Sequence, residues 1–192
     1  YIMPGFALAK KSKEIFEQNT NVEGLILFKH GIFSFGETAQ ASYERMIEMV
    51  SLAETEIGKR RSRIFPSIEI PGQLASVSEI APILRGLCVM EGGTNKRRLI
   101  MDFRTNEVIL KYVNGADLGR YSQQGTVTPD HVIRTKSKPL LTTLPEVGKI
   151  QEFAAAARVS VKGYIAEYHA YFARNNKNQA VLKTELDPMP RV

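Results

Sequence analysis

The sequence predicts a three-layer α/β protein in which helices cover a sheet. The continuous apolar run Gly24–Phe28 is typical of a strand that is covered on both faces. The following segment, Thr38–Lys59, repeats apolar residues at three- and four-residue intervals, as a helix that packs one face on a sheet does. We therefore expect the strand to be central in the sheet and the helix to lie on it.

The first third of the chain alternates helices and strands. Roughly helical spacing of apolar residues predicts a helix over Gly5–Asn19. The strand Gly24–Phe28 leads to Lys29-His30-Gly31, where the chain must turn, and Ile32–Phe35 can form a second short strand. Thr38 is expected to cap the next helix, whose apolar stripe consists of Tyr43, Met46, Ile47, Val50, Ala53 and Ile57.

The middle of the chain is predicted to add strands. Ser76-Val77-Ser78-Glu79 has the form of a capping box that opens a short helix through Leu87. Arg98–Phe103 and Val108–Val113 are expected to pair as a hairpin, and His131–Thr135 to form another short strand.

A long helix and a tail complete the chain. Apolar residues at helical spacing predict a helix over Pro145–Arg174, in which Gly163 is the weak point. The tail Asn175–Val192 is polar and then rich in proline, as a linker is. Tyr164, Tyr168, Tyr171 and Phe172 could form a stacking platform, but at this spacing aromatic residues are more often part of a core.

Composition narrows the class of protein. The chain has 192 residues and a single cysteine, which excludes cysteine-based zinc clusters and suits the reducing cytoplasm. No apolar run reaches the length of about 20 residues that a membrane helix needs, so we expect a soluble protein. The net charge of +6 comes from scattered residues, which favours phosphorylated metabolites over nucleic acid as partners. The first residue is Tyr1, so we expect that a preceding segment is missing.

Histidines offer the main chemistry in the sequence, because the common phosphate-loop, hydrolase, zinc-protease and dinucleotide motifs are absent. The three histidines are His30, His131 and His169. His30 stands at the end of a strand and before a glycine, where a side chain can be presented as a metal ligand. The alternative, which position alone favours, is that His30 caps the strand by hydrogen bonding.

A family resemblance bears on His30. The segment Gly24–Gly36, with Thr38, Tyr43 and Glu54 after it, resembles the class II aldolase and adducin family, whose signature is an apolar strand, His-Gly, an aromatic residue, a glycine and an amphipathic helix. The resemblance implies an α/β/α fold with a mixed, mostly antiparallel sheet, and makes His30 the third ligand of a zinc ion. The other two ligands, a His-x-His pair, and the carboxylate base would lie upstream of this chain, so no catalytic residue is assigned within it.

More of the chain resembles one branch of that family. Met3–Lys10, Thr128–Lys136 and Leu186–Val192 are similar to fusions of a rhamnulose-phosphate aldolase with a short-chain dehydrogenase. Such a protein would cleave a ketose 1-phosphate to dihydroxyacetone phosphate and lactaldehyde, and NAD would bind only in the dehydrogenase half. The resemblance also implies a homo-oligomer. The other possibility is an adducin-like interaction module without catalysis.

On this basis the chain divides into three parts. Residues 1–63 would be the C-terminal part of the aldolase core, 64–144 a second, strand-rich block, and 145–192 a helix and linker toward the dehydrogenase. Within the second block, the Thr128–Lys136 segment has two readings. It is either a structural turn and edge strand, or it presents His131, Arg134 and Lys136 on one strand face to a phosphate or to the dehydrogenase domain.

Overall fold

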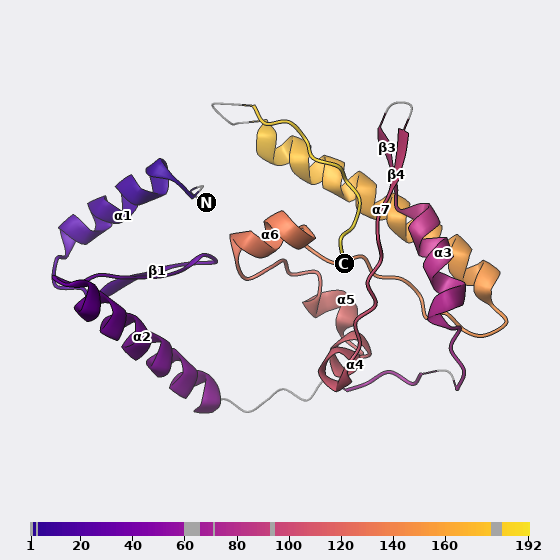
Figure 1. The fold of residues 1–192 in the computed structure, drawn as a ribbon, viewed down its shortest axis with the longest axis horizontal. Coiled ribbons are helices and arrows are strands. Elements are labelled where there is room, and N and C mark those ends of the chain that lie inside the picture. Colours follow the sequence, from indigo (N-terminus) through magenta and orange to yellow (C-terminus); the bar gives the residue numbers. More distant parts are fainter. Residues whose placement is uncertain (1, 3, 60–65, 71, 93–94, 178–181) are drawn as a thin grey trace. The chain divides into compact units, whose positions relative to one another are not determined.

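The computed structural model describes residues 2, 4–59, 66–70, 72–92, 95–177 and 182–192 (Figure 1). The chain divides into two compact units. The first consists of Tyr1–Ile64 with Val127–Pro129, and the second of Phe65–Thr126 with Asp130–Val192.

The first unit is a hairpin accompanied by two helices. Its elements are α1 (Phe6–Gln18), β1 (Gly24–Leu27), β2 (Gly31–Ser34) and α2 (Ala39–Lys59). The two strands pair antiparallel. Helix α2 packs on β2. The Ser42 hydroxyl donates to the Ser34 carbonyl at 3.2 Å, and the Arg45 guanidinium donates to the Phe35 carbonyl at 2.8 Å. These bonds fix the start of the helix against the end of the hairpin.

The helix starts were predicted correctly from their caps. The Ala41 amide donates to Thr38 Oγ1 at 3.1 Å, which satisfies one of the free N–H groups at the start of α2. At α3 (Val77–Leu87) the capping box is formed, because the Ser76 amide donates to Glu79 Oε2 at 2.8 Å.

The expected burial of the first strand is wrong for the described part of the chain. The strand is one of two in a small sheet, not a central one. Ile26 and Phe28 are 82% and 89% exposed. The apolar run predicts two covered faces, but covering a strand takes neighbours on both sides, and only β2 pairs with it among the described residues.

The second unit contains the buried core. Helix α3 packs against α7 (Ile150–Asn176), the helix that crosses the unit in Figure 1. Between them along the chain come a hairpin, β3 (Val89–Gly92) with β4 (Asn95–Arg98), and the short helices α4 (Glu107–Val113), α5 (Leu118–Tyr121) and α6 (Pro129–Thr135). The buried apolar side chains of α7 repeat along one face of the helix, as the sequence predicted, and are Phe153, Ala157, Val161 and Tyr164. Ala75, just before α3, is buried as well.

The hairpin predicted over Arg98–Phe103 and Val108–Val113 is wrong, because its second half is helix α4. The Asn106 side chain accepts from the Ile109 amide at 2.8 Å and caps the helix. Lys111 pairs with Glu107 one turn earlier at 2.7 Å. These local bonds favour the helix over the strand that the β-branched residues suggested.

The strand predicted at His131–Thr135 is also wrong, because Pro129–Thr135 is helix α6. Proline at the first helical position loses no hydrogen bond, since that amide would have no partner within the helix. Arg134 donates to the Asp130 carboxylate at 2.9 Å, with the spacing of a helical pair. The residues around Pro129 therefore start a helix rather than a turn.

The described residues combine helices with small antiparallel sheets, which fits an α/β fold. None of the helices in the described part of the chain has the length and apolar character needed to cross a bilayer.

Candidate functional site

His30 lies in the tight turn that joins β1 to β2. Its amide donates to the Leu27 carbonyl at 2.9 Å, which closes a four-residue β-turn. The third residue of the turn, Lys29, has φ 57°, a left-handed value that costs a residue with a side chain about 1 to 2 kcal/mol. The turn brings the His30 imidazole to the end of the hairpin, where it is partly exposed.

The His30 ring has an aromatic neighbour but no set of co-ligands. It meets the Phe33 ring edge to face, with the ring centroids 6.5 Å apart. Among the described residues no three His, Cys, Asp or Glu side chains are grouped as a metal site would require. A catalytic zinc site normally takes three protein ligands, so the described residues alone do not fit a zinc ion. His30 offers the right kind of donor for one position.

The other two histidines lie on helices of the second unit. His131 belongs to α6. His169, on α7, forms a hydrogen bond from Nδ1 to Glu185 Oε1 at 2.7 Å. Neither belongs to a group of metal ligands in the part of the chain that the structure describes, and neither was assigned as a ligand from the sequence.

The Thr128–Lys136 segment does not present its charges on one strand face, since most of it is helix α6. Arg134 is exposed and engaged with Asp130. Lys136, in contrast, is only 8% exposed and has φ 67°. Its ammonium donates to the Asp187 carbonyl and lies 4.2 Å from the centre of the Tyr168 ring. Burial lowers the pKa of Lys136, while the Asp187 carboxylate acts in the opposite direction.

Lys136 is one anchor of a segment that we call the C-terminal strap, residues 182–192. The strap runs along α7 in Figure 1. Side-chain hydrogen bonds link Asn176 to the Lys183 backbone at 2.8 and 3.1 Å. At the far end the Leu140 amide donates to the Val192 carbonyl at 2.7 Å. Within the strap, Arg191 pairs with the Asp187 carboxylate at 2.6 Å. The tail interpreted as a linker is therefore attached to the second unit.

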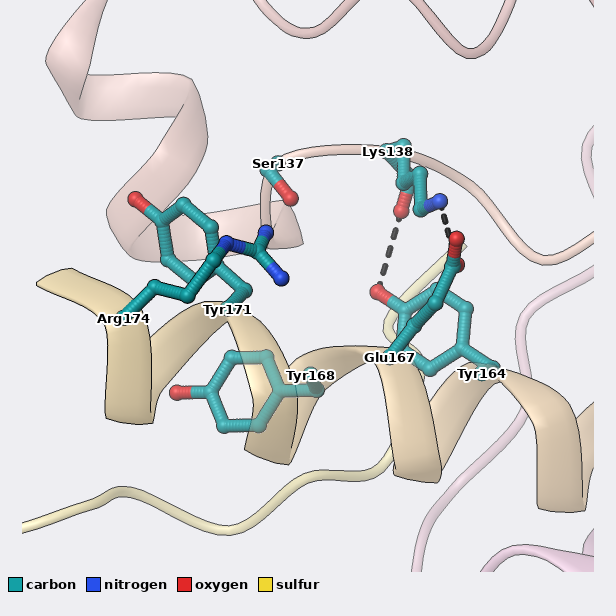
Figure 2. A pocket seen from close by; sticks show the side chains of 7 residues that line it. All are labelled: Ser137, Lys138, Tyr164, Glu167, Tyr168, Tyr171 and Arg174. Atoms are coloured by element: carbon teal, nitrogen blue, oxygen red, sulfur yellow. Dashed lines mark hydrogen bonds and ion pairs between the residues drawn. The ribbon is translucent and has the colours of Figure 1, made fainter.

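A cavity of about 250 Å³ lies between α7 and the loop that follows Lys136 (Figure 2). One side of it is closed by paired groups. The Tyr164 hydroxyl donates to the Lys138 carbonyl at 3.0 Å, and the Lys138 ammonium pairs with the Glu167 carboxylate. Burial raises the pKa of Tyr164 to about 12, so its hydroxyl keeps its proton at neutral pH. The cavity is lined by Ser137, Lys138, Tyr164, Glu167, Tyr168, Tyr171 and Arg174.

The α7 tyrosines differ in their surroundings, and the stacking platform stays a hypothesis. Tyr164 is buried in the core, as the packing interpretation predicted. Tyr168 and Tyr171 line the cavity with Arg174, which the sequence analysis did not select. Its signal in the sequence was the spacing: Tyr164, Tyr171 and Arg174 follow one another at intervals of seven and three residues, which places them near one helix face.

Comparison with known proteins identifies the family. Residues 75–192 match the family described as "Aldolase class II, second domain". The chain belongs to the class II aldolases. The match covers α3 through the strap, so the core around α7, the cavity and the Lys136 anchor all lie in the second domain of a class II aldolase.

A curated relative extends over both units of this class II aldolase chain. It is a Bacillus subtilis (strain 168) protein named "Uncharacterized oxidoreductase YuxG", 29% identical over 189 residues. The alignment covers 93% of this chain but only 26% of the relative, so the chain spans about a quarter of that protein. No solved structure matches the chain.

Proposed function

We propose that this chain is part of a zinc-dependent aldolase that cleaves a ketose 1-phosphate of the rhamnulose type to dihydroxyacetone phosphate and lactaldehyde. The observation that carries the proposal is the position of His30 at the accessible end of a tight hairpin turn, in a chain of the class II aldolase family. An imidazole held by a short turn on a paired hairpin is a defined donor, which is what a metal ligand has to be.

In this proposal His30 holds one position of the metal. Its ring must be neutral to bind, and two further imidazoles and the carboxylate base come from outside the described residues. When bound, zinc would supply the positive charge that stabilises the electrons released as the carbon–carbon bond breaks. Within this chain the β1–β2 turn places His30, and its ring lies beside the Phe33 ring.

We also propose that the chain belongs to a longer protein that carries a short-chain dehydrogenase half, which binds NAD and oxidises the aldehyde product. One observation supports this. The relative that matches 93% of the chain is named an oxidoreductase and is about four times longer than the matched region.

The proposal includes the remaining assignments. Residues 1–63 would complete the first aldolase domain, 64–144 form a second block, and 145–192 provide the helix and the link. In the complete protein β1 and β2 would join a larger mixed sheet between two helical layers, which would cover the exposed Ile26 and Phe28 side chains. We place the protein in the cytoplasm as a homo-oligomer that acts on a sugar phosphate.

The competing function is an adducin-like interaction module that keeps the fold without catalysis. The match to the aldolase second domain over residues 75–192 favours the enzyme. A measurement of aldol cleavage by the longer protein separates the two, since only the enzyme releases aldehyde.

The test replaces His30 by Ala in the longer protein that contains this chain. Loss of one of three protein ligands should lower both bound zinc and cleavage of rhamnulose 1-phosphate by orders of magnitude. Zinc is measured by atomic absorption and cleavage by aldehyde release. His169→Gln is the matched control, because His169 pairs with Glu185 and is outside the proposed site. Wild-type zinc content in the His30→Ala protein would refute the ligand assignment.

A further inference from the structure

The cavity beside α7 carries a cationic group without a counter-charge. Its charged lining residues are Lys138, Glu167 and Arg174. Lys138 and Glu167 pair with each other, so their charges largely cancel. Among the described residues no carboxylate forms an ion pair with Arg174. The cavity therefore has a net positive side at Arg174.

Arg174 faces a hydroxyl across this side of the cavity. In Figure 2 its guanidinium extends from α7 toward the Ser137 side chain. Guanidinium N–H groups and a hydroxyl on opposite walls can donate to one tetrahedral oxyanion. The opposite end of the cavity suits an anion less well, because the Lys138 ammonium is paired with the Glu167 carboxylate and the Tyr164 hydroxyl donates to the Lys138 carbonyl.

Aromatic rings line the same space. Tyr168 and Tyr171 belong to the cavity wall and present apolar surface on which the carbon part of a small ligand can lie. The rings beside Arg174 favour an anion that has a short carbon skeleton.

We propose that this cavity binds a small phosphate monoester, with the phosphate between Arg174 and Ser137 and the carbon part against Tyr168 and Tyr171. The volume of about 250 Å³ is just below the usual range for ligand sites, which suits a triose phosphate or free phosphate and excludes a dinucleotide. The site lies within the second unit and does not depend on the metal assignment at His30. It therefore gives the second aldolase domain a ligand of its own.

The experiment is calorimetric titration of the chain at neutral pH and about 0.15 M salt, where weak surface attraction is screened. The probes are inorganic phosphate, dihydroxyacetone phosphate and unphosphorylated dihydroxyacetone. We expect saturable one-site binding of both phosphates and none of dihydroxyacetone. Tighter binding of the triose phosphate than of free phosphate would identify the ester as the ligand, and equal binding would identify phosphate alone; both support the anion site.

Variants on one helix make the test specific. Arg174→Gln should weaken phosphate binding by about tenfold or more, because a charge-assisted hydrogen bond is lost, and Ser137→Ala should weaken it less. Arg158→Gln removes the same charge from an exposed position of α7 outside the cavity and should leave binding unchanged. The proposal is overturned if phosphate does not saturate the protein, if both arginine variants lose binding equally, or if dihydroxyacetone binds as well as its phosphate.

Discussion

Tyr164 combines packing with a hydrogen bond, as buried tyrosines usually do. Its ring belongs to the buried core of the second unit, while its hydroxyl reaches the cavity wall and bonds to the Lys138 carbonyl. The helical spacing predicted the first role, because burial follows from the apolar stripe. It could not predict the second, since the acceptor is 26 residues away in the sequence.

Because of the Tyr164 hydroxyl, the free energy of unfolding depends on pH in the alkaline range. Its pKa rises from 10.0 to about 12 on folding, first because of burial and then because of neighbouring Tyr168. The folded protein therefore keeps a proton that the unfolded chain loses. This contribution is complete below pH 10 and is lost as the pH rises from 10 toward about 12.

We expect the free energy of unfolding to fall less steeply across this interval in Tyr164→Phe than in the wild type. At neutral pH the variant should be less stable by about 1 kcal/mol, because the Lys138 carbonyl loses its donor. Urea denaturation followed by circular dichroism at several pH values measures both effects. Tyr171→Phe, at a position 44% exposed, is the control and should follow the wild type. Parallel curves for wild type and Tyr164→Phe would contradict the argument.

At the scale of elements, the sequence predicted long helices well and short ones poorly. Helices α2 and α7 extend over several turns, so their apolar stripes repeat often enough to be recognised. Helices α4 and α6 have seven residues each, too few for a period, and their β-branched residues resembled strands. The signals that favour a helix there are the residues at the helix start and the ion pairs between residues one turn apart. The β-propensity of single residues takes no account of either.

Gly163 was expected to be the weak point of the long helix, and the structure makes this testable. A Cβ added there would meet nothing within 4 Å. Gly163→Ala should therefore raise the free energy of unfolding by about 0.5 to 1 kcal/mol, because alanine loses less backbone entropy on entering a helix.

The contrasting variant is Gly148→Ala, just before the same helix. This position is equally open but has φ +80°, a conformation that strains a residue with a side chain. Gly148→Ala should lower the free energy of unfolding, whereas Gly163→Ala should raise it. The midpoints of urea denaturation measure both effects. Equal effects of the two substitutions would mean that available space, and not backbone conformation, decides the outcome.

At the scale of the whole molecule, contacts between residues that are far apart in the sequence could not be predicted. The hairpin turn that holds His30 was expected from a local pattern of apolar residues and glycine. The contact between Lys136 and Asp187 joins residues 51 positions apart, and no periodicity reports such a pair. The ligand set of a metal is likewise non-local, so His30 alone was assigned from the sequence, and that assignment stays a prediction.

For the chain by itself we expect weak zinc binding and no aldol cleavage. A single imidazole leaves the cation mostly hydrated, and the described residues group no three donors around it. Calorimetric titration with zinc and an aldehyde-release assay on rhamnulose 1-phosphate measure the two properties. Tight one-to-one binding that disappears in His131→Ala would show that the metal site has been assigned to the wrong histidine.

The C-terminal strap has a consequence that no single contact explains. An exposed pair such as His169–Glu185 contributes at most about 1 kcal/mol when it stands alone. Once Lys136 holds Asp187, however, Glu185 and Lys183 are tethered close to this anchor, so they meet their partners His169 and Asn176 at an effective concentration in the millimolar range or above. The strap is thus attached as a multivalent ligand is. The strap detaches only when several weak bonds are open at the same time. A single broken bond re-forms while the other bonds still hold the strap.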